Sequence, residues 1–356
     1  MPAASVQHLE PLRLAAQRAL GSAVDRGELL HGGGSERRYY RFRALEPGTG
    51  AASCVGVLGA QGAETRAFLG FTRHFAAQGI PVPRVLEEAP DQHWYLLEDL
   101  GPFPLSESLR RWRAQPGGAA QAQQALLQVV EWLPVLQVRG GQGLDYSLCV
   151  EGTELAGAAY GADVELFLGQ YVPRFVLGER VPAPAVLRDL GRLVSRLDAL
   201  PRQHFCHRDF QTRNIMWAGQ GAAVGPVFLD YQGGRRGALA YDLASLLYSP
   251  DSGLGEPERQ TLQVHYLRAL AGQGVAVEEK AFLAEFHAVV LVRRLQALGA
   301  YVRIALGAGK SEYLDKIPAA LATLRELQAG GHLRMGLPAL EEWLAQAVLA
   351  PAESAQ

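Results

Sequence analysis

The chain has 356 residues, of which 48% are hydrophobic and 20% are charged, and its formal net charge is -2. This length allows two lobes with separate cores, because single hydrophobic cores seldom grow past roughly 250 to 300 residues. The near balance of charge, without a block of like charges, argues against nucleic acid or an anionic membrane as a partner.

The cysteine pattern and the start of the chain bear on the compartment. The three cysteines are widely spaced and include no C-x-x-C pair, which argues against a disulfide framework and a zinc site and favours reduced thiols. Residues 1–20 lack a basic stretch joined to a continuous apolar run, so they do not resemble a signal peptide. The most apolar stretch, residues 282–306, is interrupted by Arg293 and Arg294. We expect a cytoplasmic protein without a membrane span, and a monomer.

The first part of the chain has the pattern of a small sheet that covers a nucleotide. An amphipathic helix is expected near residues 9–20, and a Gly-rich turn at residues 32–38 precedes an aromatic run at residues 39–42. Glycines let backbone N–H groups approach phosphates closely, so we interpret the turn as a hairpin over the nucleotide. A flexible surface turn has the same composition. Ser35 and Arg38 are the candidate nucleotide contacts in this turn.

Further along, an apolar strand ends abruptly and mainly helical patterns follow. Residues 53–58 and 94–97 predict strands, and residues 64–78 predict a helix between them. From about residue 104 helical spacing dominates. The expected helices include residues 115–133, residues 163–177, which would border an acceptor pocket, and a leucine-rich stretch that Pro201 ends.

The most informative segment is the loop from His207 to Asn214, which reads H-R-D-F-Q-T-R-N. An H-R-D-x-x-x-x-N loop places a carboxylate, Asp209, where it can orient and deprotonate a substrate hydroxyl, and an amide, Asn214, where it can ligate magnesium. Two predicted strands around a Gly-rich turn follow, and the second ends in Asp230, the other candidate metal ligand. This order predicts a kinase-type site, with a chance surface turn as the alternative.

Three stretches resemble the aminoglycoside-phosphotransferase branch of the protein-kinase-like superfamily, and within it the bacterial kinases of the anomeric hydroxyl of N-acetylmuramate and N-acetylglucosamine. The first is the loop itself, through Met216. The second runs from Leu229 to Leu247 and includes D-Y-Q and Y-D-L-A-S-L-L. The third runs from Arg293 to Pro318, and a generic aminoglycoside kinase need not have it. The resemblance extends from about Gly33 to about Leu327.

This resemblance implies an α+β, protein-kinase-like, two-lobed fold. A small N-lobe with an antiparallel sheet and the hinge would span residues 1–103, and a larger, mainly helical C-lobe would span residues 104–356. The implied cofactors are ATP and Mg²⁺, with adenine hydrogen-bonded by the Glu98 carbonyl and the Leu100 N–H. A plain strand end is the alternative at that point. Asp242 resembles the buried aspartate that ties the catalytic-loop backbone to the next helix.

The resemblance also implies a sugar acceptor. The candidate sugar contacts are Gln211, Arg213, Gln232 and Arg293, with a supporting role behind the substrate as the alternative for each. The product would be a sugar 1-phosphate, which implies a functional link to a sugar-1-phosphate uridylyltransferase in cell-wall recycling. The competing enzyme hypothesis is an aminoglycoside or choline-type kinase, although such cationic substrates require carboxylates and this loop is flanked by arginines.

One departure from the protein-kinase pattern concerns the phosphates. Protein kinases hold the α- and β-phosphates with a Lys on the third strand, whereas this chain has no Lys before Lys280, and Gly56 or Leu58 falls in the expected region. A nucleotide-binding pseudokinase would explain the missing Lys, yet the three residues expected to carry the chemistry, Asp209, Asn214 and Asp230, are all present. We expect an arginine to replace the Lys, because its planar fork binds phosphate oxygens. Arg38 is favoured, with a structural role as the alternative, and Glu64 either pairs an arginine or caps its helix. The candidate arginines are Arg37, Arg38, Arg41 and Arg43.

Overall fold

The computed structural model describes residues 9–30, 37–46, 51–59, 62–176, 178–219 and 224–349. Ser35 lies outside the described residues. The chain forms two compact units: the first comprises Met1–Val129, Val138–Thr153 and Thr212–Arg235, and the second comprises Val130–Gln137, Glu154–Gln211 and Arg236–Gln356. The division at residue 103 stays a prediction.

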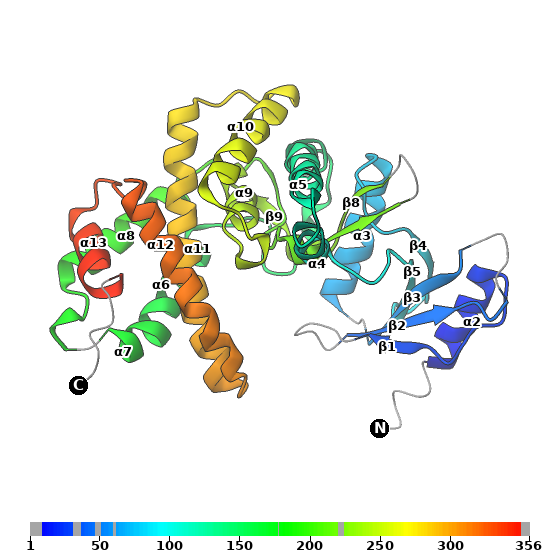
Figure 1. Cartoon of the computed structure of the whole chain (residues 1–356). Helices are drawn as coiled ribbons and strands as arrows, with labels where there is room; N and C mark the ends of the chain where they lie inside the picture. Colours follow the sequence, from blue (N-terminus) through cyan, green and yellow to red (C-terminus); the bar gives the residue numbers. More distant parts are fainter. Residues whose placement is uncertain are drawn as a thin grey trace. The chain divides into compact units, whose positions relative to one another are not determined.

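A five-stranded antiparallel sheet is the centre of the first unit (Figure 1). Each pair of neighbouring strands is antiparallel, as expected for the small lobe of a protein-kinase-like fold. In sheet order the strands are β1 (Glu28–Leu30), β2 (Arg38–Arg43), β3 (Ser53–Leu58), β5 (Trp94–Glu98) and β4 (Val85–Glu88). The α+β fold class is therefore confirmed.

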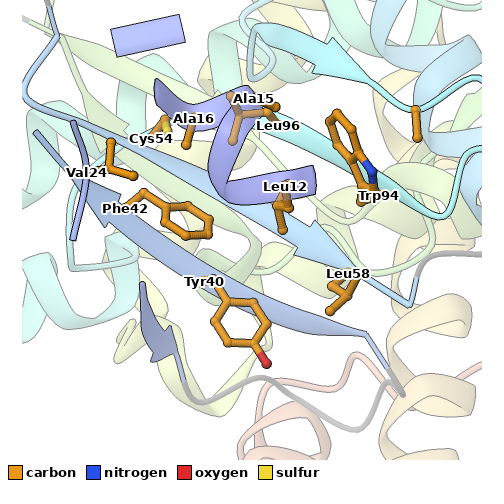
Figure 2. Close-up of a cluster of buried hydrophobic side chains, with 11 residues drawn as sticks. Leu12, Ala15, Ala16, Val24, Tyr40, Phe42, Cys54, Leu58, Trp94 and Leu96 are labelled. Carbon is orange, nitrogen blue, oxygen red and sulfur yellow. The ribbon is translucent and has the colours of Figure 1, made fainter. Parts of the chain in front are cut away.

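One face of this sheet packs against α2 (Leu9–Leu20). Figure 2 shows Leu12, Ala15 and Ala16 of this helix over side chains of the strands. The strand residues in this cluster are Tyr40, Phe42, Cys54, Leu58, Trp94 and Leu96. Because successive side chains of a strand point to opposite faces, residues 38, 40 and 42 of β2 and residues 54, 56 and 58 of β3 share the α2 face.

This alternation corrects one sequence prediction. A Cβ atom on Gly56 would lie 2.7 Å from Leu12 Cδ2, so the backbone of β3 approaches α2 at this position. Leu58 is buried in the same cluster. The expectation that Gly56 or Leu58 marks the place of a phosphate-binding Lys is wrong, because both face α2. On the other face of β3 stand Val55 and Val57.

The remaining elements of the first unit include α3 (Ala63–Ala77), α4 (Leu105–Arg113) and the hairpin β7 (Ile215–Ala218) and β8 (Gly225–Phe228). Helix α3 and the β7–β8 hairpin agree with the sequence prediction. Phe68 on α3 stacks on Tyr95 and Tyr231, with ring centroids 5.2 and 5.3 Å apart. The Tyr231 hydroxyl also hydrogen-bonds Thr72 Oγ1 at 2.5 Å. Aromatic packing thus ties α3 to the turn that follows Asp230.

The second unit is mainly helical (Figure 1). Its long helix α11 contacts α6, α9 and α12, and α6 approaches so closely that a Cβ on Gly299 would lie 2.7 Å from the Leu166 backbone. Among the described helices none is long and apolar enough to cross a membrane. The elements are α6 (Gly157–Leu166), η3 (Phe167–Tyr171), α7 (Val172–Phe175), α8 (Pro184–Asp198), β6 (His204–Cys206), α9 (Leu239–Leu247), α10 (Glu256–Gly272), α11 (Glu279–Gly307), α12 (Ile317–Ala329) and α13 (Pro338–Trp343). Two further elements, α5 (Gly118–Pro134) and β9 (Arg235–Gly237), include residues of both units.

Candidate active site

The backbone of the catalytic loop is held by a buried carboxylate in the second unit. Asp242, in the first turn of α9, accepts hydrogen bonds from the His207 N–H at 2.8 Å and the Arg208 N–H at 2.9 Å. Arg208 has φ +73°, a left-handed conformation that is uncommon for residues other than glycine. The two hydrogen bonds stabilise this turn just before Asp209, and the predicted architectural role of Asp242 is confirmed.

A polar network surrounds this carboxylate. Gln137 Nε2 lies 3.4 Å from Asp242 Oδ2 and donates to the Leu239 carbonyl at 3.1 Å, while its Oε1 accepts from the Tyr266 hydroxyl at 2.7 Å. Burial raises the pKa of Asp242, although His207 and the two backbone N–H groups act in the opposite direction. A fully buried carboxyl with this many donors makes a rigid anchor for the loop.

The candidate base Asp209 has its own support. Gln211 Nε2 donates to Asp209 Oδ1, and Gln211 Oε1 accepts from Ser249 Oγ at 3.1 Å. Both ends of the Gln211 amide therefore bind protein groups, and its predicted role as a sugar contact stays a prediction. The sequence analysis did not identify Ser249, because a single serine after α9 carries no motif.

Two charged side chains share the electrostatic surroundings of the loop in the second unit. Arg293 on α11 places its guanidinium 5.0 Å from the centre of the Tyr241 ring, and its pKa is raised, against the effect of burial, by Tyr241, Asp163 and Asp209. Burial raises the pKa of Asp163 on α6, whereas Arg293 and Arg208 lower it. Arg293 was predicted as a sugar contact. The sequence analysis named Asp163 only as the start of a predicted helix. Its charge within a largely apolar segment could have indicated a functional residue.

The first unit contains a cavity of about 510 Å³, within the size range of small-molecule sites. Its apolar lining comes from β1, β3, β5 and β7 and from the residue that follows β8. The apolar lining includes Leu30, Val55, Leu97, Met216 and Leu229. The polar lining includes Arg37, Arg41, Glu98, Asp99, Arg213, Asn214, Asp230 and Gln232, and Leu100 also lines the cavity. Glu98, Leu100, Asn214 and Asp230 were all predicted from the sequence.

The two candidate metal ligands both line this cavity. Asn214 ends a short 3-10 turn, and its carbonyl accepts from the Leu229 N–H at 2.9 Å, which brings the start of β7 beside the end of β8. Asp230 has φ +61° and an exposed side chain, and its Oδ1 accepts from Gln232 Nε2 at 2.7 Å. An amide oxygen and a carboxylate are the oxygen ligands that Mg²⁺ prefers, so the donor set fits this ion.

Arg213 and Gln232 also line the cavity of the first unit, beside the candidate metal ligands. Their predicted contacts with the sugar stay predictions. Arg38 pairs with Leu58 in the register of β2 and β3, on the sheet face that carries Tyr40 and Phe42. The structure thus gives no support to Arg38 as a nucleotide contact, and Arg37 lines the cavity instead.

The segment after β5 is fixed by two carboxylates. The Glu98 side chain accepts from the Arg84 N–H at 2.8 Å and from Arg84 Nε at 3.0 Å. Asp99 pairs with Arg41 at 2.7 Å and accepts from the Gly101 N–H at 3.0 Å. Burial would raise the pKa of Asp99, but its hydrogen bonds, first of all from Arg41, lower it. The backbone of this expected hinge is therefore held in one conformation.

Solved structures share the fold. A choline kinase from Cryptosporidium parvum matches with a TM-score of 0.56 at 13% identity, over 91% of this chain and 94% of that one. At this identity the similarity concerns the fold alone.

Curated proteins are similar in sequence over most of the chain. A protein from Caulobacter vibrioides named N-acetylmuramate/N-acetylglucosamine kinase is 28% identical over 71% of this chain and 67% of its own length. A protein of the same name from Pseudomonas aeruginosa is 25% identical over 77% of this chain and 79% of its own length.

A family model described as the phosphotransferase enzyme family (APH) matches residues 31–281. This match begins directly after β1 and includes strands β2 to β5, the catalytic loop and α9, and it covers well over half of the chain. The chain therefore belongs to the phosphotransferase enzyme family and is a phosphotransferase with an alcohol group as acceptor.

Proposed function

We propose that this protein is an ATP-dependent sugar kinase that phosphorylates the anomeric hydroxyl of N-acetylmuramate, N-acetylglucosamine or both. The observation that carries the proposal is the catalytic loop, in which Asp209 is oriented by Gln211 and follows a backbone turn anchored on Asp242. The names of the Caulobacter and Pseudomonas relatives support the choice of sugar.

The cavity of the first unit is the proposed nucleotide site. Its apolar lining, which includes Val55 and Met216, suits a flat purine. The Glu98 carbonyl and the Leu100 N–H are the proposed partners of the adenine edge. Asp99 and its hydrogen bonds would keep these two backbone groups in place, which lowers the entropy cost of binding.

Asn214 and Asp230 are the proposed holders of magnesium. When bound, this ion neutralises charge on the nucleotide phosphates. Asp230 presents an exposed carboxylate, and Gln232 fixes its orientation through Oδ1. The protein then positions charged groups and performs little covalent chemistry, as is general for phosphoryl transfer.

Asp209 is the proposed group that orients the acceptor hydroxyl and takes its proton late in the reaction. An anomeric hydroxyl is more acidic than an ordinary alcohol, so a single carboxylate suffices. Gln211 donates to Oδ1 and thereby helps to orient the carboxylate that would accept the proton. The proton leaves the acceptor oxygen for the carboxylate as that oxygen bonds to the transferred phosphorus and the bond to the leaving phosphate oxygen breaks.

The charges near Asp209 favour an anionic or neutral acceptor. Arg293 and Arg208 accompany the carboxylates of Asp163 and Asp209 in this region. A lactyl carboxylate, as on N-acetylmuramate, would be attracted to Arg293. Aminoglycoside and choline-type acceptors carry positive charge, which these arginines would repel. The product would be a sugar 1-phosphate, the substrate class of a uridylyltransferase.

The test measures ATP consumption with magnesium and N-acetylmuramate, N-acetylglucosamine, glucose, kanamycin or choline as acceptor. We expect turnover on an N-acetylated sugar, a 1-phosphate product in the phosphorus NMR spectrum, and loss of turnover in Asp209→Asn. Asp91→Asn, at an exposed turn, is the matched control and should retain full activity.

Two outcomes would contradict the proposal. Turnover only on kanamycin or choline would assign the protein to the aminoglycoside or choline-type kinases. ATP binding without turnover on any acceptor would favour a nucleotide-binding protein without catalysis.

A further inference from the structure

Arg37 directly precedes β2, next to the Gly-rich turn, and lines the cavity together with Asn214 and Asp230. Its side chain is only 7% exposed. Its Nη2 donates to Glu64 Oε2 in the first turn of α3. Burying an arginine beside a cavity costs desolvation free energy, which its pairing with a carboxylate only partly offsets. Such a cost favours a role in ligand binding over a purely structural contact.

The register of the sheet shows where this guanidinium lies. Tyr39 on β2 pairs with Val57 on β3, and Val57 pairs with Tyr95 on β5. These three side chains form one row on the cavity face. Arg37 interacts with both Tyr39 and Tyr95, which flank Val57. Its charge therefore lies close to the place that a lysine side chain at position 57 would reach.

Other arginines of the described segment 37–46 have different partners. Arg41 pairs with Asp99 and donates to the Gly101 carbonyl at 2.9 Å, so it holds the segment after β5. Arg43 is half-exposed at the end of β2 and pairs with Glu28 on β1. Arg38 is on the α2 face of the sheet. Arg37 is thus the arginine of this segment whose position suits the phosphates.

We propose that Arg37 and Glu64 form the pair that positions the α- and β-phosphates of the nucleotide, in place of a third-strand lysine and its helix glutamate. This inference rests on the proposed ATP-dependent function. A guanidinium has five N–H donors, so it can bond Glu64 and phosphate oxygens at the same time, whereas a lysine contacts phosphate as a point charge. Glu64 orients the guanidinium, and the phosphates receive bidentate hydrogen bonds.

The test compares the binding of ATP and of adenosine to the wild type, Arg37→Ala, Arg37→Lys and Glu64→Gln by calorimetry. We expect Arg37→Ala to weaken ATP binding about 10- to 100-fold, the equivalent of a charged hydrogen bond, and to leave adenosine binding within about twofold. Arg37→Lys should recover part of the affinity for ATP. Glu64→Gln should weaken ATP binding about 3- to 10-fold, because it removes only the charge that orients Arg37.

Arg43→Ala is the matched control, since it removes an arginine from β2, the strand that follows Arg37, and an ion pair with a glutamate outside the cavity. Both ligands should bind this variant as they bind the wild type. Equal losses for ATP and adenosine in Arg37→Ala, or no loss for either, would overturn the inference and leave the proposed function intact. A wild-type protein that binds neither ligand would contradict the proposed function and the inference with it.

Discussion

The two regions that carry the proposed chemistry hold their carboxylates in opposite ways. Asp242 in the second unit is fully buried and accepts hydrogen bonds from two backbone N–H groups. Asp230 in the first unit is exposed in the cavity and accepts a hydrogen bond from Gln232. Burial with several donors fixes a backbone, whereas exposure keeps oxygen atoms accessible to a cation. We therefore expect Asp242 to act on the protein backbone and Asp230 to act on a bound ligand.

The largest expected effect separates ligand chemistry from stability. Asp230→Asn removes the charge but keeps the left-handed backbone, which Asn also tolerates. We expect kcat to fall by about 10³-fold, because the charge stabilisation by a bound cation amounts to several kcal/mol, with the melting temperature within about 2 °C of the wild type. Turnover assays at rising magnesium concentration and thermal unfolding check this. A variant with more than a tenth of wild-type kcat would contradict the ligand role.

The second prediction tests the opposite case. Asp242→Ala leaves the His207 and Arg208 N–H groups buried without their acceptor, so we expect the free energy of unfolding to fall by about 2 to 5 kcal/mol. Activity should fall as well, since the backbone before Asp209 loses its anchor. Urea unfolding and turnover assays measure both. Asp315→Ala, at an exposed position of the same unit, is the control and should change neither. Loss of activity at unchanged stability would contradict the structural role of Asp242.

Several features of both regions could be predicted from the sequence because they are local. The loop from His207 to Asn214 is one continuous motif, and the hairpin after it is visible as two apolar runs around a Gly-rich turn. The role of Asp242 followed from its place in a second continuous stretch. Helix boundaries deviated by a few residues, as for the helix expected at residues 163–177, which starts at Gly157.

Other features depend on register and long-range packing, which one sequence does not reveal. The pairing of Arg37 with Glu64 joins residues on different elements, and two neighbouring arginines are equivalent until the strand alternation separates them. Likewise, Gly56 is recognisable as a residue that faces α2 only once the helix is in place. Side-chain partners such as Ser249 for Gln211 come from separate segments without any shared pattern.

The third prediction concerns the pH dependence of stability in the second unit, through the titration of His287. Burial, with a smaller effect of His332, lowers the pKa of His287 to about 4, and the two rings stack at 4.1 Å. The unfolded chain has a histidine pKa near 6.5 and binds the proton first. Stability is therefore complete above that value and is lost as pH falls from about 6.5 to about 4.

Between pH 7.5 and pH 5 this histidine should cost the wild type about 2 kcal/mol of unfolding free energy. His287→Gln should lack that part of the loss, and its turnover at pH 7.5 should match the wild type. Urea unfolding of both proteins at the two pH values measures the difference. Parallel pH dependences of the two proteins would refute the assignment.

The smallest expected effect concerns the orientation of the Asp209 side chain. The prediction tests whether this side chain is held as firmly as the loop backbone that Asp242 anchors. Ser249 Oγ donates to Gln211 Oε1, which makes Nε2 the end of the amide that faces Asp209. In Ser249→Ala the amide can turn over and present an oxygen to the carboxylate, where the two would repel. We expect kcat to fall about 3- to 10-fold, the equivalent of one hydrogen bond of about 1 kcal/mol.

Ser252→Ala is the matched control for this variant. Ser252 belongs to the same turn and donates to the Ser249 carbonyl at 2.7 Å. Both variants should lose similar stability, and only Ser249→Ala should lose kcat, with the KM for ATP unchanged in each. An equal loss of kcat in the two would mean that the turn as a whole, and not the orientation of one amide, determines the position of Asp209. The position of the Asp209 carboxylate would then depend on the rigidity of its surroundings, as the backbone anchored by Asp242 does. The two units would then differ only in how deeply their carboxylates are buried.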